Sequence, residues 1–117
     1  MIKVYQYAKC STCRKALKWL DAKKVAYQPV DIVTAPPKKA ELQRALKSGL
    51  PLKKLFNTSG QSYREGKWGE KLAKGLTEAD ALEALAKDGK LVKRPFILSE
   101  AGVTVGFDEA LFKKTYR

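Results

Sequence analysis

Two cysteines, Cys10 and Cys13, stand three positions apart in the stretch YAKCSTCRKALKWL, residues 7–20. A Cys-x-x-Cys pair can bind a metal, form a structural disulfide, or act as a nucleophilic thiol with a second thiol that resolves its mixed disulfides. A structural zinc site normally takes four protein ligands. The sequence has no third cysteine and no histidine, so we expect no metal site.

The hydrophobic pattern predicts that this pair lies between a strand and a helix. Residues 2–7 alternate apolar and polar side chains and are rich in strand-forming residues. From Ser11 onward the apolar residues follow helical spacing and form one stripe, made of Cys13, Ala16, Leu17 and Leu20. We therefore expect Cys10 at the start of the helix and Cys13 as the more buried sulfur.

That placement favours a redox role for the pair. The free N–H groups of a first helical turn stabilise a thiolate and lower the pKa of a neighbouring cysteine, and Lys9 and Arg14 add positive charge nearby. Cys10 would attack a disulfide, and Cys13 would resolve the mixed disulfide. Because the sequence has no histidine, the usual general base of a cysteine protease is missing. Two ordinary buried thiols near a helix start are the alternative interpretation.

The remaining pattern predicts a single α/β domain over residues 1–117. We expect a second strand within residues 25–33, and two short strands within 94–107 around a Glu-Ala-Gly turn. Helices are expected at residues 34–49, 77–89 and 108–117. Residues 50–76 have irregular periodicity and several glycines, which indicates short helices joined by turns. The predicted order is β-α-β, then helices, then β-β-α.

The chain is strongly basic, with 24 Lys and Arg, 12 Asp and Glu, and a formal net charge of +12. Residues 1–60 hold thirteen basic and three acidic side chains, a net charge of +10. Such a surface can favour an anionic substrate, an acidic protein or nucleic acid, although solvated lysines on helix faces explain it as well. The basic residues are spread over several elements without a DNA-reading motif. We therefore expect no direct sequence-specific binding of nucleic acid.

The apolar runs are too short for a membrane span, which needs roughly 18 residues, and the N-terminus lacks the apolar core of a signal peptide. We expect a cytoplasmic protein that does not interact with a membrane. Thiols in that compartment are kept reduced, so a close cysteine pair there is more often redox-active or metal-binding than a permanent disulfide.

Three segments together resemble the arsenate reductase (ArsC) family in its Spx/MgsR-like branch: YAKCSTCRKALKWL, LPLKKLFNTSG and GKLVKRPFILSEAGVTVGF. The similarity runs from Tyr5 to about Phe112. It implies a thioredoxin-like fold with a mixed four-stranded sheet and a helical insertion. It also implies that a cis peptide bond precedes Pro95, that Pro95 faces the active cysteine, and that Arg94 binds an oxyanion through its fork of N–H donors.

The same resemblance argues against efficient arsenate reduction. Glutaredoxin-linked arsenate reductases have a single cysteine in this loop and three arginines that bind the oxyanion. Here Asn57 stands at the position of the first arginine, and Gly106 or Phe107 at that of the last, so only Arg94 remains. Each missing arginine should cost about 1.5 to 3 kcal/mol of charged hydrogen bonding.

Two functions follow from the resemblance. The first is a thiol-disulfide oxidoreductase that acts on a thiol, disulfide or oxyanion substrate without a bound cofactor, with glutathione or a dithiol reductant as co-substrate. The second is an Spx-like redox-sensing regulator that binds the C-terminal domain of the RNA polymerase α subunit. The candidate catalytic residues are Cys10, Cys13 and Arg94, and the candidate substrate-binding residues are Lys9, Ser11, Thr12, Arg14, Asn57 and Pro95.

Overall fold

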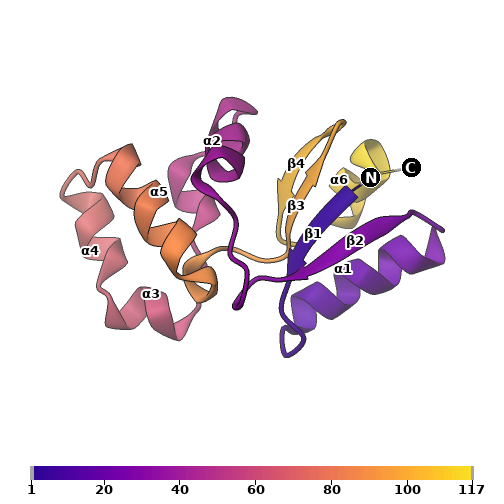
Figure 1. Ribbon diagram of the computed structural model, residues 1–117, viewed down its shortest axis with the longest axis horizontal. Coiled ribbons are helices and arrows are strands. Elements are labelled where there is room, and N and C mark those ends of the chain that lie inside the picture. The colour runs from indigo at the N-terminus through magenta and orange to yellow at the C-terminus, as the bar shows by residue number, and fades with distance from the viewer. Residues whose placement is uncertain (1, 117) are drawn as a thin grey trace.

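The computed structural model describes residues 2–116 and has the predicted order of elements (Figure 1). The first unit comprises β1 (Ile2–Gln6), α1 (Ser11–Ala22) and β2 (Tyr27–Asp31). A helical segment follows, with α2 (Lys39–Lys47), the 3-10 helix η1 (Leu52–Leu55), α3 (Gln61–Glu65), α4 (Trp68–Ala73), α5 (Glu78–Lys87) and the 3-10 helix η2 (Gly89–Leu91). The chain then forms β3 (Phe96–Ser99), β4 (Gly102–Val105) and α6 (Glu109–Thr115).

The four strands form one mixed sheet in the order β2-β1-β3-β4. Strands β1 and β2 are parallel, and α1 makes the crossover between them. Strand β3 is antiparallel to both β1 and β4. All four residues of β3 are buried, in keeping with its central position. The expected thioredoxin-like arrangement, with a helical insertion after the first β-α-β unit, is confirmed.

Each face of the sheet carries its own hydrophobic cluster, because side chains alternate along a strand. Val4 and Ile97 pack with α1 and α6 on one face. Tyr5 and Phe96 pack with the helical segment on the other, and their rings lie 6.0 Å apart. Figure 1 shows this division, with helices α2–α5 on one side of the sheet and α1 and α6 on the other. Both the parallel crossover and the insertion are thus anchored to β1 and β3.

Helix α2 begins at Lys39 rather than at residue 34, so the expected position of its start was wrong. The prolines at 36 and 37 precede the helix and do not enter its first turn. The backbone N–H of Lys38 donates to Glu41 Oε1 at 2.9 Å, as in a capping box. The helical start is therefore set by Glu41 instead of by proline.

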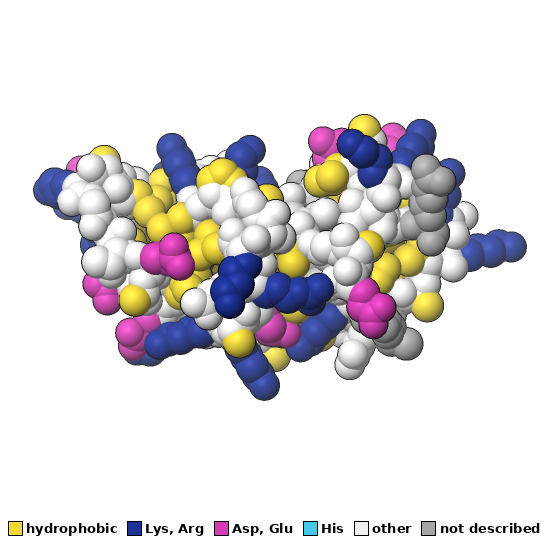
Figure 2. All heavy atoms as spheres, turned by 90° about the horizontal axis from the view of Figure 1, so that it is seen from above, with side chains coloured by type: hydrophobic (Ala, Val, Ile, Leu, Met, Phe, Trp, Pro, Cys, Tyr) yellow, Lys and Arg dark blue, Asp and Glu magenta, His cyan; other side chains and the backbone are white. Residues whose placement is uncertain are grey.

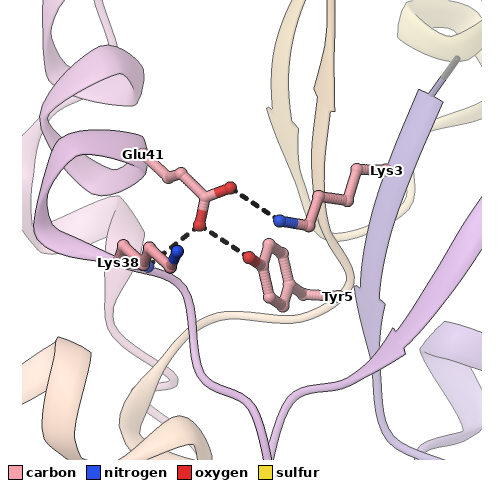
Figure 3. Close-up of polar contacts among 4 residues, drawn as sticks. All are labelled: Lys3, Tyr5, Lys38 and Glu41. Carbon is pink, nitrogen blue, oxygen red and sulfur yellow. Dashed lines mark hydrogen bonds and ion pairs between the residues drawn. The ribbon is translucent and has the colours of Figure 1, made fainter.

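Glu41 also ties α2 to the sheet (Figure 3). The hydroxyl group of Tyr5 donates to Glu41 Oε1 at 2.6 Å, and Lys3 Nζ donates to Oε2 at 3.0 Å. Burial raises the pKa of the Glu41 carboxyl, but the hydrogen bonds from Lys38, Tyr5 and Lys3 outweigh it, so the pKa lies below its ordinary value. Three donors thus hold one carboxylate between β1 and the helical segment.

Other element ends differ from the prediction by a few residues. The first strand ends at Gln6, one residue earlier than expected. Helix α5 starts after Thr77, whose hydroxyl accepts from the Asp80 N–H as expected, but it ends at Lys87, and Gly89 begins η2 instead. Met1 and Arg117, which the predicted domain and final helix included, lie outside the described residues. Over residues 2–116, no helix is both long and apolar enough to cross a membrane.

Candidate redox site

Cys10 is the N-cap residue of α1. Its backbone is extended (φ −90°, ψ 116°), and its Sγ accepts a hydrogen bond from the backbone N–H of Cys13 at 3.2 Å. The Cys10 N–H in turn donates to the Tyr7 carbonyl oxygen at 3.0 Å, which closes the loop between β1 and α1. Cys10 is half-buried, and Cys13 is fully buried, as the helical periodicity predicted. Both cysteines are free thiols.

Arg94 reaches this loop from the far end of the chain. It immediately precedes β3, and because β3 lies beside β1 in the sheet, the start of β3 is next to the loop that follows β1. The Arg94–Pro95 peptide bond is cis, as the family resemblance implied. The Arg94 guanidinium lies over the Tyr7 ring, 4.8 Å from its centroid.

The surroundings separate the two thiols chemically. Burial raises the pKa of Cys10, but hydrogen bonds from the Cys13 thiol and backbone N–H, with the hydrogen bonding and charge of Arg94, outweigh it and lower that pKa below its ordinary value. Burial, followed by the hydrogen bond to Cys10, raises the pKa of Cys13 to about 12. The site therefore holds one thiol that ionises readily and one that stays protonated.

A polar hollow of about 410 Å³ lies beside Arg94. Its lining includes Tyr7, Asn57, Lys90 and Arg94. Asn57 is held there by its backbone N–H, which donates to the Leu91 carbonyl oxygen at 2.7 Å. The Nε and Nη1 atoms of Arg94 are buried and have no hydrogen-bond partner. Such N–H donors can bind an anionic or carbonyl oxygen that enters the hollow.

The position of the third family arginine is occupied by uncharged residues. The Gly106 N–H donates to the Pro95 carbonyl oxygen at 3.0 Å, and Gly106 has a φ of +75°, a conformation that favours glycine. Phe107 packs edge-to-face on Phe112, with the ring centroids 4.9 Å apart. Cys10 and Cys13 thus interact with a single arginine, Arg94, and Asn57 lines the polar hollow beside that arginine.

The other predicted site residues lie around the start of α1 but not in the polar hollow. The side chains of Lys9 and Ser11 are exposed. Arg14 is also exposed, and its Nη1 donates to the Ala8 carbonyl oxygen at 3.4 Å. Thr12 is half-buried and lines a different hollow, on the side of Gly106. The cation that lowers the Cys10 pKa is therefore Arg94, which is far from Cys10 in the sequence.

Six lining residues of the polar hollow were missed in the sequence: Tyr7, Gly60, Gln61, Ser62, Glu65 and Lys90. Tyr7 was assigned only to the end of the first strand, yet its ring carries Arg94 and its carbonyl holds Cys10. An aromatic residue three positions before the nucleophile is a usable signal for this role. Lys90, on the rim of the polar hollow, had no such signal, because only the turn η2 places it there. Within residues 2–116, no group of three or more potential ligands could hold a metal ion.

Comparison with known proteins identifies the family. A model of the ArsC family matches residues 5–115. The protein YusI of Bacillus subtilis is 48% identical over 113 residues, which cover 96% of this chain and 95% of YusI. The global transcriptional regulator Spx of Streptococcus agalactiae is 29% identical over 125 positions, covering 100% of this chain and 87% of Spx.

The fold agrees with that assignment. The crystal structure of an ArsC-family-related protein from Bacteroides fragilis superposes with a TM-score of 0.92 at 43% identity, covering 97% of this chain and 96% of the other. The family match spans β1 through α6 and includes the Cys10 loop and the Arg94–Pro95 segment. This chain is therefore a member of the ArsC family, with Spx regulators among its relatives.

Proposed function

We propose that the protein is a thiol-disulfide oxidoreductase in which Cys10 is the nucleophile and Cys13 the resolving thiol. The observation that carries this proposal is the opposite perturbation of the two sulfurs: the Cys10 pKa is lowered, whereas that of Cys13 is raised to about 12. Because the thiolate is the reactive form, the lowered pKa favours Cys10 over Cys13 for the first attack. Cys13 becomes a nucleophile after Cys10 has reacted.

The reaction transfers two electrons from the cysteine pair to a substrate disulfide. The Cys10 thiolate attacks one substrate sulfur, a Cys10–substrate S–S bond forms, and the other substrate sulfur leaves as a thiolate. Cys13 then loses its proton and attacks Cys10 Sγ, which releases the second substrate thiol and leaves a Cys10–Cys13 disulfide. A dithiol reductant or glutathione must return two electrons to this disulfide before the next turnover.

The remaining site residues have supporting roles in this proposal. Arg94 stabilises the Cys10 thiolate, and its unpartnered N–H groups, with Asn57, bind a polar group of the substrate in the polar hollow. Pro95 shapes the surface beside the attacked sulfur. The N–H of Cys13 stabilises the Cys10 thiolate in the reduced state. Stabilising the reduced pair in this way makes the corresponding disulfide more oxidising.

The test is turnover of a small disulfide by the whole protein with a dithiol reductant. We expect Cys10→Ser to abolish turnover, and Cys13→Ser to accumulate a mixed disulfide on Cys10 that mass spectrometry detects. Lys18→Gln, on the exposed face of α1, is the control and should retain wild-type turnover. Wild-type rates in both cysteine variants would refute the proposal.

A second candidate is a redox-controlled regulator that binds the C-terminal domain of the RNA polymerase α subunit. The observation that favours it is the likeness to Spx over the full length of this chain, together with the Cys-x-x-Cys pair. In that role the Cys10–Cys13 disulfide would change the charge and shape of the start of α1. A pull-down with the isolated α domain, under oxidising and reducing conditions, tests this function. Absence of binding in both states would exclude it.

A further inference from the structure

A second depression, with a lining different from that of the polar hollow, reaches Thr12 in the first turn of α1. It consists of two adjoining hollows, of about 400 and 490 Å³, that share Pro51, Lys54 and Lys93. At one end the lining reaches Phe56, and at the other it reaches Thr12 in the first turn of α1. We call these two adjoining hollows together the lysine groove. Its volume is in the range that accommodates several atoms of a ligand or side chains of a peptide.

Backbone pairing brings the lysines of the groove together. The segment after η1 runs antiparallel to the segment after η2, through the bridge between Phe56 and Val92. The Lys93 N–H donates to the Leu55 carbonyl oxygen at 2.7 Å. Lys53 and Lys54, at the end of η1, therefore lie beside Lys93, although about forty residues separate them in the sequence. The groove is a product of the fold and not of one basic run.

The charge of the lysine groove is largely uncompensated. Among residues 2–116, none of Lys53, Lys54 and Lys93 forms an ion pair, since the ion-paired lysines are those at positions 3, 39 and 87. Asp108 is the acidic residue in the lining, and one of its oxygens already accepts the Leu111 N–H as the N-cap of α6. Figure 2 shows Lys and Arg side chains spread over much of one face of the molecule, with acidic side chains between them. An acidic ligand would find three ammonium groups in the lysine groove.

The position of the groove links it to the chemistry at Cys10. Thr12 lies two residues after Cys10, and Lys93 lies one residue before Arg94, so the groove begins where the redox site ends. Gly106, which also lines it, leaves room for the Lys93 side chain, because a Cβ on Gly106 would lie 3.3 Å from Lys93 Cε. A chain whose sulfur is attacked by Cys10 would therefore continue into the lysine groove.

We propose that the lysine groove binds an acidic, extended segment next to the disulfide of a protein substrate and so selects acidic protein disulfides. The inference rests on the proposed oxidoreductase function and names its substrate class. Pro51 and the aliphatic parts of the lysines contact the peptide backbone, while the ammonium groups pair with its Asp and Glu side chains. Single-stranded nucleic acid fits less well, because Phe56 is only 1% exposed and Phe107, the half-buried aromatic residue of the lining, is packed edge-to-face on Phe112.

The experiment compares three peptide disulfides of equal length whose cysteine is flanked by Asp and Glu, by Ser and Gln, or by Lys. Reduction of each by the full chain is followed as kcat/KM, with a dithiol reductant in excess. We expect the acidic peptide to be preferred over the neutral one by about tenfold at low salt, from three rim charge pairs. The preference should shrink at high salt, which screens exposed charges.

Two variants test whether the groove causes the preference. Replacing Lys53, Lys54 and Lys93 by Gln should remove the preference for the acidic peptide, because kcat/KM for that peptide should fall to the level of the neutral one. Lys54→Glu with Lys93→Glu should reverse it in favour of the Lys-flanked peptide. A matched control replaces three exposed lysines elsewhere, Lys15, Lys18 and Lys74, by Gln and should keep the preference.

The outcomes separate this inference from the function on which it rests. If no peptide disulfide and no small disulfide is reduced, the oxidoreductase function itself fails. If all three peptides are reduced at equal rates, or if the control variant loses the preference as fully as the groove variant, the groove is not the selecting surface. A groove variant that loses affinity for a single-stranded oligonucleotide but keeps its peptide preference would likewise overturn the proposal.

Discussion

The raised pKa of Cys13 predicts how steeply the rate of the second step of the proposed reaction depends on pH. In the reduced protein this pKa is about 12. At pH 7 the pKa therefore lies five units above the pH, so only about one Cys13 in 100,000 is a thiolate. Resolution of the mixed disulfide needs this thiolate, so its rate should rise about tenfold for each pH unit until the pH approaches the pKa.

Formation of the mixed disulfide itself changes the Cys13 pKa. Once Cys10 is bonded to substrate it carries no negative charge, so its contribution to raising the Cys13 pKa is lost. Burial, the largest cause, persists because Cys13 lies on the inner face of α1 with no exposed surface. The pKa in the mixed disulfide should therefore lie below 12 but above the ordinary value of 9.0. The tenfold slope should hold from about pH 6 to about pH 8.5.

An aromatic disulfide that releases a coloured thiol separates the two steps. One equivalent is released when Cys10 attacks, and a second when Cys13 resolves the adduct, so rapid mixing gives two phases. We expect the rate of the first phase to vary little with pH above the lowered Cys10 pKa. The rate of the second phase should rise about tenfold for each pH unit. Cys13→Ser should show the first phase alone. A second phase independent of pH between 6 and 8.5 would refute the assignment of Cys13 as a buried, protonated resolving thiol.

Three further outcomes follow from the structure. Arg94→Gln should raise the Cys10 pKa, because the guanidinium contributes to lowering it. The rate of alkylation of Cys10, measured against pH, gives this pKa, and an unchanged value would contradict the role assigned to Arg94. Glu41→Gln should lower the free energy of unfolding by about 1 to 3 kcal/mol at pH 7, because charged hydrogen bonds to the carboxylate are lost. The difference from the wild type should shrink as the pH falls through the lowered pKa of the Glu41 carboxyl. Denaturant titrations that give a constant difference down to pH 2 would argue against this role. Tyr116, with its pKa raised by burial from 10.0 to about 12, favours the folded state below pH 10, and that contribution, on the order of 2 to 3 kcal/mol, is lost between pH 10 and 12. Tyr116→Phe should lower the free energy of unfolding by about 1 kcal/mol at neutral pH and reduce its fall between pH 10 and 12. If the free energy of unfolding falls equally in the variant over this range, another group dominates.

Helical and strand periodicity predicted the parts of the site that are close in sequence. The alternation in residues 2–7 and the stripe from Cys13 to Leu20 are local patterns, and they placed Cys10 at the start of a helix and Cys13 inside. The ends of elements were less predictable. Both the prolines at 36 and 37 and the capping side chain of Glu41 are signals for a helix start, and they indicate different first residues. The local composition does not decide between these signals, since Glu41 is also held by Tyr5 from the sheet.

The sequence by itself determined that one thiol stands at a helix N-terminus, that a second follows one turn later, and that the chain has no histidine to assist them. Tertiary structure alone decided which cation acts on that thiol. Lys9 and Arg14 are nearest in sequence but are exposed, and Arg14 donates to the Ala8 carbonyl oxygen, whereas Arg94 reaches the thiol through the pairing of β3 with β1. A different pairing, the bridge between Phe56 and Val92, placed Lys93 beside Lys54 to form the lysine groove. Electrostatic interactions depend on distance and burial in space, and strand pairing sets both for residues that the sequence separates.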